Sequence, residues 1–306
     1  MKNKIVLVGC GNVGISYVYA LINQKVNIDE IVIIDPNEKN TRGEIIDFDH
    51  CLPFVNSNVK IYKGDYSECK NASMVVITAG ARQKEGETRL DLLLRNAKII
   101  KEIVLNVIKN DFKGIFLNAT NPLDIMTQLI FENSNFSANK VIGTGTNLDS
   151  ARLKYYLNEH FNTEYDKIYA YVLGEHGDSS MIPWSKVTVN NLKVINSLTS
   201  KEKSDYEEKV RNAGYELLNS KGYSDLAIGI CLADITKIII NKEEKEVCVS
   251  NYDENEEIYY GYPAIINETG IKSRLKLELT LDEQEKLNNS IAIIKKALKE
   301  LKEKDL

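Results

Sequence analysis

The segment VGCGNVG (residues 8–14) places the strongest constraint on the fold of this chain. It has the spacing G-x-G-x-x-G in Gly9, Gly11 and Gly14, and it overlaps the end of the apolar run KIVLVG (4–9). Glycines at this spacing allow a backbone to approach a pyrophosphate group at the N-terminus of a helix. The segment therefore predicts a strand, a tight turn and a helix that together bind a dinucleotide.

An acidic residue completes this pattern. Asp35 ends the next apolar run, EIVIID (30–35), and dinucleotide-binding units carry an acid about 20 residues further on. There Asp35 would accept hydrogen bonds from ribose hydroxyls and repel a 2′-phosphate, which favours NAD over NADP. Two other interpretations stay open: the glycines cluster by chance, or Asp35 only caps the helix after Pro36.

Apolar runs alternate with helical patterns along the rest of the first half. Further strands are expected at 59–64, 73–80, 114–119 and 140–145. The clearest helix is expected at 88–110, with an apolar face made of Leu93, Ala97, Ile100, Val104 and Val107. This alternation predicts an α/β fold, a doubly wound parallel sheet of the Rossmann type with helices on both faces. We assign residues 1–143 to it as an NAD-binding domain.

The pattern changes in the second half. Helices are expected near 149–161, 200–220 and 223–241, with a strand at 167–174. Three strand-like runs follow with short connections, at 246–252, 258–266 and 270–279, and predict an antiparallel meander. The last segment, 282–303, predicts an amphipathic helix that buries Leu287, Ile291, Ile294, Leu298 and Leu301. Residues 144–306 are thus expected to form an α+β substrate domain with antiparallel strands.

Composition excludes several functional classes. The chain has 306 residues and a net charge of −5, so it offers no basic field to nucleic acid. It has neither a recognisable signal peptide nor an apolar run of transmembrane length, and we expect no membrane partner. Its five cysteines contain no C-x-x-C pair, which favours free thiols in a reducing cytoplasm and argues against a metal site.

Four polar stretches are expected to meet at one edge of the sheet, near the carboxyl ends of the strands. They are 78–89, 118–124, 145–152 and 174–178. The first contains Gly80 and Gly86 before a long helix, a composition typical of a mobile lid, with a plain surface loop as the alternative.

His176, Asp149 and Arg152 are the candidate chemical groups in these stretches. His176 is one of three histidines and lies between Gly174 and Gly177. Asp149 and Arg152 are three residues apart at the start of a predicted helix, so their side chains share a face. Taken alone, the pair is better explained as a surface ion pair of little energetic value, and His176 could be a turn residue.

In combination and in this order, the motifs resemble the lactate/malate dehydrogenase family, closest to its bacterial L-lactate dehydrogenases. The resemblance covers essentially the whole chain. It implies that His176 is the general acid/base and that Asp149 orients its ring. It also implies that Arg152 binds the substrate carboxylate, that Arg89 polarises the carbonyl group and that Asn121 supports the carbonyl oxygen. A catalytically silent NAD sensor would not need these residues together and is disfavoured.

The same resemblance implies further contacts and the assembly. The Asn121–Pro122 bond is expected to be cis. The residues expected to contact NAD are Gly9, Gly11, Asn12, Val13, Gly14, Asp35, Tyr66, Gly80, Ala81, Asn121, Thr144 and Ile228. Family members are tetramers or dimers, so a homotetramer is expected, without an N-terminal arm because the chain starts almost at its first strand.

Gln83 and Ser224 bear on the choice of substrate. Malate enzymes of the family carry arginine at the position of Gln83, and a neutral glutamine leaves the second carboxylate of oxaloacetate unpaired. The expected reaction is therefore the reversible reduction of pyruvate to L-lactate by NADH, the terminal step of lactic fermentation. Ser224 replaces the threonine usual in lactate enzymes, and the missing methyl enlarges the pocket. A hydroxyisocaproate-type preference for larger 2-oxo acids is the alternative, and malate dehydrogenase is a more distant one.

A final expectation concerns regulation. Many bacterial lactate dehydrogenases bind fructose 1,6-bisphosphate between subunits through an arginine and a histidine. This chain has Lys154 and Tyr169 at those positions. Lysine lacks the bidentate fork of arginine and tyrosine carries no positive charge, so little or no activation is expected.

Overall fold

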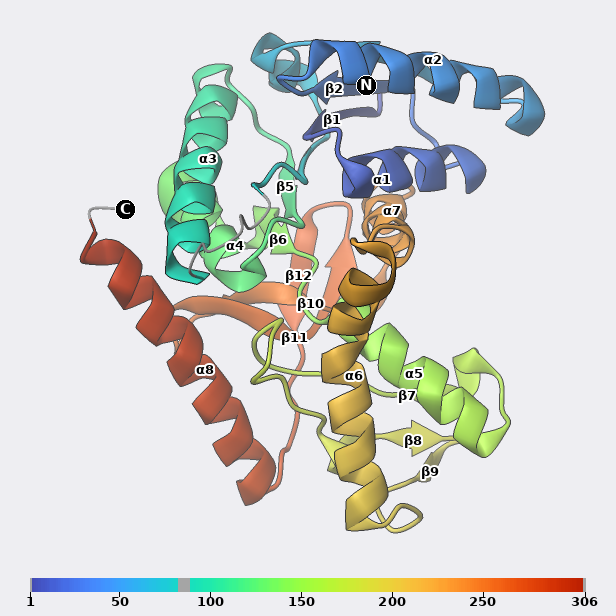
Figure 1. The fold of residues 1–306 in the computed structure, drawn as a ribbon, viewed down its shortest axis with the longest axis vertical. Helices are drawn as coiled ribbons and strands as arrows, with labels where there is room; N and C mark the ends of the chain where they lie inside the picture. Colours follow the sequence, from blue (N-terminus) through green and yellow to red (C-terminus); the bar gives the residue numbers. More distant parts are fainter. Residues whose placement is uncertain (1, 82–88, 305–306) are drawn as a thin grey trace.

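The structure of the protein is a computed structural model that describes residues 2–81 and 89–304, with Arg89 described by its backbone alone. Gln83, the side chain of Arg89 and most of the expected lid therefore lie outside the described residues. Figure 1 shows a sheet that runs through the molecule between layers of helices.

Within the described residues, this sheet has nine strands in the order β12-β11-β10-β6-β5-β4-β1-β2-β3. They are β1 (Lys4–Val8), β2 (Glu30–Ile34), β3 (Lys60–Lys63), β4 (Met74–Ile77), β5 (Ile115–Asn118), β6 (Val141–Gly143), β10 (Lys245–Asp253), β11 (Ile258–Asn267) and β12 (Gly270–Arg274). Strands β1 to β6 are parallel, and their order 3-2-1-4-5-6 is that of the Rossmann fold. The predicted fold class is confirmed.

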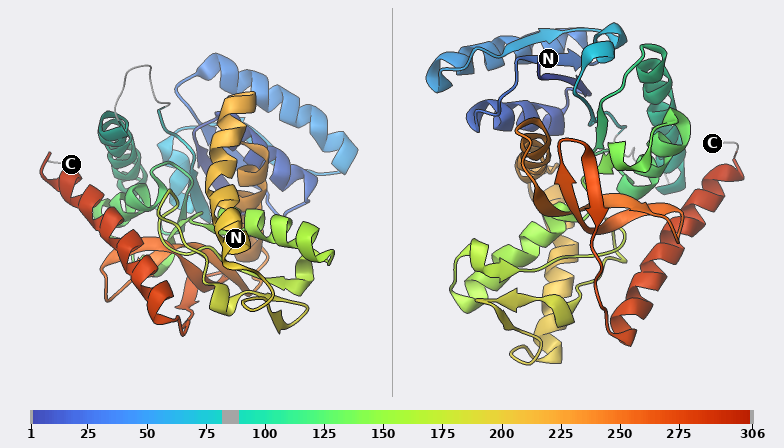
Figure 2. Two further views of the ribbon diagram at one scale, coloured as in Figure 1. Left: turned by 60° about the horizontal axis from the view of Figure 1, so that its bottom comes forward. Right: turned by 180° about the vertical axis from the view of Figure 1, so that it is seen from behind.

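Helices cover both faces of this sheet. The α-helices of the described chain are α1 (Asn12–Asn23), α2 (Glu38–Val55), α3 (Arg89–Lys109), α4 (Leu123–Ser134), α5 (Asn147–Phe161), α6 (Ser200–Lys221), α7 (Leu226–Ile240) and α8 (Leu281–Lys302). Buried residues of α5 and α6 form a separate core with residues between 168 and 198. Short 3-10 helices lie at Tyr66–Asn71 (η1), Ala138–Lys140 (η2), Tyr165–Lys167 (η3) and Trp184–Lys186 (η4). Figures 1 and 2 show α3, α4 and α8 on one side and α1, α2 and α7 on the other. Along the described part of the chain, no helix has both the length and the apolar run needed to cross a membrane.

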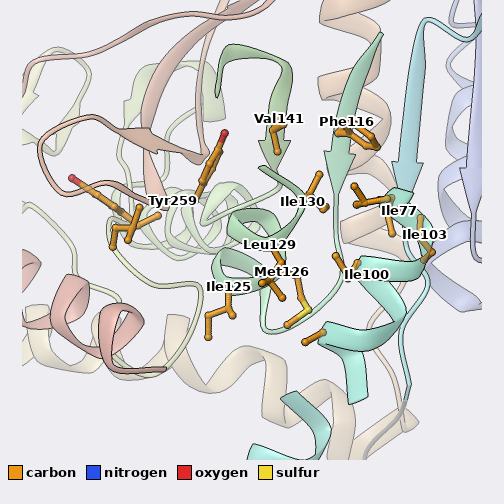
Figure 3. Packing of buried hydrophobic residues seen from close by; sticks show 14 of the residues in the cluster. Ile77, Ile100, Ile103, Phe116, Ile125, Met126, Leu129, Ile130, Val141 and Tyr259 are labelled. Atoms are coloured by element: carbon orange, nitrogen blue, oxygen red, sulfur yellow. The ribbon is translucent and has the colours of Figure 1, made fainter. Parts of the chain in front are cut away.

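Alternate residues of the parallel strands supply two separate cores. Ile5 and Leu7 of β1 pack with α1 and α7, whereas Val6 and Val8 pack with α3 and α4. In the core that contains α3 and α4, residues of β4 and β5 pack against Ile100 and the side chains of α4, as Figure 3 shows. The predicted apolar faces of α3 and α8 are buried, which confirms that helical spacing located them correctly.

The strand predicted at 167–174 is wrong for most of its length. A second, three-stranded sheet consists of β7 (Ile168–Tyr169), β8 (Thr188–Val189) and β9 (Leu192–Lys193). In the buried run after β7, side chains replace part of the strand ladder. The Val172 N–H donates to Ser150 Oγ at 2.9 Å, and Thr146 Oγ1 donates to the Val172 carbonyl at 2.5 Å. The apolar composition of this run therefore mainly reflects burial, and its strand pairing is limited to isolated bridges of Leu173 with Met181 and of Gly174 with Gly261.

The predicted meander is present, but it extends the parallel sheet and does not stand apart from it. Strands β10, β11 and β12 pair antiparallel, and Ser250 of β10 pairs antiparallel with Gly143 of β6. Strand β12 ends at Arg274, earlier than the expected 279, and the next N–H, that of Leu275, donates to the Pro263 carbonyl at 3.0 Å. The expected domain boundary at 143 thus falls at the end of β6, inside one continuous sheet.

Candidate active site

The carboxyl ends of the parallel strands gather the expected site residues at one edge of the sheet. Gly9 follows β1, Asp35 follows β2, and Ala81, Asn121 and Thr144 lie shortly after β4, β5 and β6. Strands β1 and β4 are neighbours, and the strand order reverses between them. Open α/β sheets bind their ligands at this edge, beside such a switch point.

The glycine loop after β1 has the geometry of an anion site. Gly9 has φ +105°, and a Cβ on Gly14 would lie 2.3 Å from the Gly9 oxygen, so both positions require glycine. A Cβ on Gly11 would meet no atom of the described chain within 4 Å. Gly11 is the N-cap of α1, and no described side chain caps that helix end. The first N–H groups of α1 therefore face open space beside the loop, as a pyrophosphate group requires.

Asp35 lies next to this loop. Its Oδ2 accepts the Cys10 N–H at 2.7 Å, and its Oδ1 accepts the Asn37 N–H at 2.8 Å. The N-cap of α2 is Asn37, whose side chain accepts the Asn40 N–H, so the capping interpretation of Asp35 is wrong. The helix N-terminus offers donors to a pyrophosphate and Asp35 offers an acceptor to ribose hydroxyls, so these residues fit NAD.

The other residues expected at the cofactor lie around the same edge. Asn12 and Val13 form the first turn of α1, and Ile228 is half-buried on α7. Tyr66 begins η1, and burial raises the pKa of its hydroxyl to about 12. Thr144 is buried, and its N–H donates to a carbonyl at the end of β5 at 2.9 Å.

Asn96 is a residue of this edge that the sequence argument missed. Its Oδ1 accepts the Ala81 N–H at 2.8 Å, and its Nδ2 donates to the Asn121 carbonyl at 2.8 Å. It thereby joins the start of the expected lid to the Asn121–Pro122 peptide bond, which is cis as expected. Asn96 lies on α3 and is 3% exposed. A polar asparagine among the apolar positions of the predicted helix 88–110 could have indicated its role.

His176, Asp149 and Arg152 come together in the structure. His176 Nδ1 lies 2.6 Å from Asp149 Oδ2, and Arg152 Nη1 donates to Asp149 Oδ1 at 3.0 Å. The side chains of Asp149 and Arg152 are 9% and 15% exposed, so the surface ion pair interpretation is wrong. Because Nδ1 faces Asp149, Nε2 is the ring nitrogen that can exchange a proton with a substrate.

The electrostatics of this group favour an imidazolium beside a carboxylate. Burial disfavours the charged ring, but the charge and hydrogen bond of Asp149 outweigh it and raise the pKa of His176. Burial also disfavours the Asp149 carboxylate, but His176 and Arg152 together hold the pKa of Asp149 below its ordinary value. The site can therefore store a proton on His176 near neutral pH and deliver it to an oxygen atom.

Arg152 is placed to bind an anion, and Gly214 lies beside its guanidinium. Gly214 of α6 faces the Arg152 guanidinium, and a Cβ there would lie 3.9 Å from both terminal nitrogens. Ser224 lies half-buried in the short connection between α6 and α7. Gly214 was not predicted from the sequence, since a glycine within a polar helical segment gives no sign of what it faces.

A second carboxylate contacts the same histidine. Asp124 of α4 accepts the main-chain N–H of His176 through Oδ2 at 2.8 Å. In the sequence, Asp124 stands out only as the last residue of the polar stretch 118–124. An acidic residue at the start of the helix after β5 was the only indication in the sequence. It did not reveal the partner, His176, which lies 52 residues further along the chain.

Comparisons with known proteins agree with this geometry. Residues 3–143 match the family model described as lactate/malate dehydrogenase, NAD binding domain, and residues 146–305 match its alpha/beta C-terminal domain. L-lactate dehydrogenase 1 of Bacillus cereus is 42% identical over 97% of both chains, and so is L-lactate dehydrogenase 2 of the same species.

Solved structures give the same result. The minor L-lactate dehydrogenase of Enterococcus mundtii, in its ligands-bound form, is 36% identical with a TM-score of 0.95 over 98% of each chain. A lactate dehydrogenase from a Medee basin deep-sea metagenome library is 38% identical with a TM-score of 0.95, over 99% of this chain and 100% of its own. The chain belongs to the lactate/malate dehydrogenase family.

Proposed function

We propose that this protein is an NAD-dependent L-lactate dehydrogenase, which reversibly converts pyruvate, NADH and a proton into L-lactate and NAD⁺. The observation that carries the proposal is the position of Asp149, whose two oxygens contact the ring of His176 and the guanidinium of Arg152. A proton donor and a carboxylate-binding cation are thereby held side by side at the edge of the sheet where the glycine loop lies. The family match and the named relatives support the same reaction.

The nicotinamide supplies the hydride when NADH is bound; the chain supplies the proton and the orientation. His176 gives the proton on Nε2 to the carbonyl oxygen of the substrate, while Asp149 keeps the proton on Nδ1 and stabilises the imidazolium. In the direction of lactate oxidation, neutral His176 takes the hydroxyl proton at the same atom. The proton thus leaves and enters the ring at the same atom in the two directions.

Arg152 holds the substrate by its carboxylate. A guanidinium and a carboxylate form two parallel hydrogen bonds, which fix orientation as well as charge. The resemblance adds Arg89, at the start of α3, to polarise the carbonyl group, and Asn121 to support its oxygen. The resemblance also adds the NAD contacts of Gly80, Ala81, Thr144 and Ile228.

Pyruvate is the preferred substrate in this proposal because Gln83 offers no charge to a second carboxylate. A larger 2-oxo acid is the second candidate, and it is favoured by the small residues Gly214 and Ser224 near Arg152 and at the α6–α7 connection. Each absent methyl leaves space for a longer substrate side chain.

We further infer that residues 1–143 bind NAD, that residues 144–306 supply the substrate site, and that four copies assemble in the cytoplasm. The assembly is supported by family resemblance, and the compartment is supported by the free state of all five cysteines.

The test is NADH oxidation by the purified protein with pyruvate, oxaloacetate and 4-methyl-2-oxopentanoate. We expect kcat/KM to be highest for pyruvate and lowest for oxaloacetate. A higher value for 4-methyl-2-oxopentanoate would replace the first candidate with the second, and failure to reduce any 2-oxo acid would refute both.

A further inference from the structure

His176 is held by two carboxylates that come from two helices. Asp149 of α5 faces ring nitrogen Nδ1 at 2.6 Å, and Asp124 of α4 accepts the main-chain N–H at 2.8 Å. The two contacts constrain different parts of the residue. Asp149 fixes the rotation of the ring, and Asp124 fixes the peptide that carries it.

Asp124 is itself enclosed. It is 2% exposed in the first turn of α4, and its Oδ1 accepts the Ser250 hydroxyl at 2.5 Å. Ser250 is fully buried in β10 and pairs with Gly143, where the antiparallel part of the sheet joins the parallel part. Burial raises the pKa of Asp124 to about 6, although the Ser250 and His176 hydrogen bonds favour its charged form. A buried carboxylate is costly unless such donors satisfy it, and these donors come from the sheet and from the catalytic segment.

The main chain around His176 depends on anchors of this kind. Gly174 has φ +92° and is held by two main-chain hydrogen bonds to Gly261, whereas Gly177 is exposed, so the backbone is anchored before His176 and conformationally freer after it. The N–H of Glu175 is anchored to Ser290 Oγ of α8 at 2.8 Å. The N–H of the next residue, His176, is anchored to Asp124.

We propose that Asp124 is a positioning residue for proton transfer: it holds the main chain of His176 so that the ring meets Asp149 and the substrate together. This inference rests on the proposed function, because it concerns the step that His176 performs there. Asp124 also acts through its charge. Among the groups that face His176, Asp149 and Asp124 raise the pKa of the ring and Arg152 lowers it, while Glu175 faces Asp124 itself.

The test compares Asp124→Ala with a matched variant on α8. Glu283 is 6% exposed and accepts the N–H and the hydroxyl of Ser185 at 2.8 and 2.6 Å, which are the same two kinds of contact made to a residue outside 174–178. Glu283→Ala therefore removes a comparable buried carboxylate whose hydrogen-bond partners, Ser185 and Thr280, lie outside residues 174–178. Asp124→Asn is the conservative variant, because its amide oxygen can still accept the His176 N–H while the charge is lost.

Three measurements are made on each variant. The first is single-turnover hydride transfer from NADH to pyruvate, which separates chemistry from product release. We expect Asp124→Ala to slow it about 10- to 100-fold, as misplacement on the order of 1 Å can do, with pyruvate KM and NADH Kd changed less than about twofold. We expect Glu283→Ala to leave the rate unchanged and Asp124→Asn to recover most of it.

The second measurement is the pH profile of kcat/KM for pyruvate. Loss of the negative charge in Asp124→Asn lowers the pKa of His176, so the alkaline limb moves to lower pH. The third is hydrogen–deuterium exchange of residues 174–178, which we expect to be about tenfold faster or more in Asp124→Ala and unchanged in Glu283→Ala.

The outcomes separate the two proposals. Wild-type hydride transfer and exchange in Asp124→Ala, or equal slowing in Glu283→Ala, would overturn the role of Asp124. If Asp124→Ala does not fold, an unshifted alkaline limb in Asp124→Asn, or a wild-type rate in Asp124→Asn despite faster exchange at 174–178, would overturn it. If the wild-type protein reduces no 2-oxo acid, the proposed function fails, and exchange at 174–178 still decides whether Asp124 holds this segment.

Discussion

At the residue scale, Asp149 connects the two positively charged groups of the site through one carboxylate. One oxygen faces the ring of His176 and the other accepts from Arg152, and all three side chains are shielded from solvent to a large extent. In a low-dielectric environment a carboxylate without donors would be protonated or exposed. The pair of donors keeps Asp149 charged, which in turn keeps His176 basic enough to carry a proton.

Replacing His176 tests this arrangement. We expect His176→Asn to slow hydride transfer about 100- to 10,000-fold, the usual contribution of a general acid. NADH binding, measured by fluorescence titration, should change little because the glycine loop and Asp35 are untouched. His160→Asn is the matched control, since His160 lies exposed near the end of α5. A His176→Asn protein with more than a few per cent of wild-type activity would remove His176 from the proton-transfer role.

Two small residues are expected to set the size of the substrate. Ser224→Thr and Gly214→Ala each add a methyl group, at the α6–α7 connection and beside Arg152. We expect each to raise the ratio of kcat/KM for pyruvate over 4-methyl-2-oxopentanoate by about tenfold, from a methyl effect of about 1–3 kcal/mol. Ser220→Thr, near the exposed end of α6, is the control and should leave the ratio unchanged. Unchanged ratios in both pocket variants would show that these positions do not face the substrate side chain.

At the element scale, two neighbouring helices each contain a glycine, and the surroundings of the two glycines differ. Gly14 lies in α1 where a Cβ would be 2.3 Å from the Gly9 oxygen, whereas a Cβ on Gly43 of α2 would meet no described atom within 4 Å. The glycine of α1 is thus required by the close approach of helix and loop. The glycine of α2 carries only the entropic cost of glycine within a helix.

We therefore expect Gly14→Ala to destabilise the protein and to weaken NADH binding, because α1 must shift from the loop whose N–H groups face the cofactor. Gly43→Ala should instead stabilise the protein by roughly 0.5–1 kcal/mol and leave NADH binding unchanged. Urea unfolding and NADH titration of both variants measure this. A tolerated Gly14→Ala would contradict the geometry of the loop.

The helix at 88–110 was predicted correctly because only one of its faces is buried. The strand at 167–174 was predicted less well because most of this buried run does not pair as a strand. Leu93 to Val107 of α3 repeat every three or four residues because one side of the helix meets the sheet. Residues 170–174 are as apolar as a strand, yet side chains such as Ser150 and Thr146 satisfy the backbone at Val172. Composition alone does not distinguish these two environments.

At the scale of the whole molecule, the protonation of His176 and Asp149 makes the stability of the fold depend on pH. The pKa of His176 is raised above 6.5 in the folded protein, so its contribution to stability is complete below about pH 6.5 and is lost as pH rises through the folded pKa. The pKa of Asp149 is lowered below 3.8, so its contribution is present above about pH 3.8 and is lost as pH falls through the folded pKa. His176 and Asp149 together therefore stabilise the folded protein most between about pH 3.8 and about pH 6.5.

The raised pKa of His176 also affects the rate of the reaction. We expect kcat/KM for pyruvate reduction to stay level through pH 6.5 and to fall above the raised pKa of His176, because reduction needs the imidazolium. Lactate oxidation needs the neutral ring and should rise over the same range. Profiles of both directions measure this, and a reduction limb centred below pH 6.5 would contradict the interaction with Asp149.

The response to fructose 1,6-bisphosphate also depends on the whole molecule, because the residues concerned come from distant parts of the chain. Glu246 accepts hydrogen bonds from the hydroxyls of Tyr169 and Tyr171, so a carboxylate lies beside a position where the effector-activated relatives need positive charge. Burial lowers the pKa of Lys154. We expect fructose 1,6-bisphosphate, titrated at low pyruvate and neutral pH, to cause little or no activation. A several-fold fall in the half-saturating pyruvate concentration would show the opposite.

The sequence by itself determined the parallel β-α-β half, the glycine loop with Asp35, the buried faces of α3 and α8, and the candidate residues His176, Asp149 and Arg152. These features are readable because each depends on residues close together in the chain: a turn that only glycine permits, or apolar positions that repeat with a helical period. The family resemblance then supplied roles that spacing alone could not.

The tertiary structure decided the contacts between distant segments. Only the fold joins β10 to β6 at Ser250, places Gly214 against Arg152, and brings Asp124 to a main-chain N–H 52 residues away. No local pattern encodes such contacts, because packing of whole elements determines which buried polar groups become neighbours. Each buried donor or acceptor must find a partner, and the fold determines which one it finds.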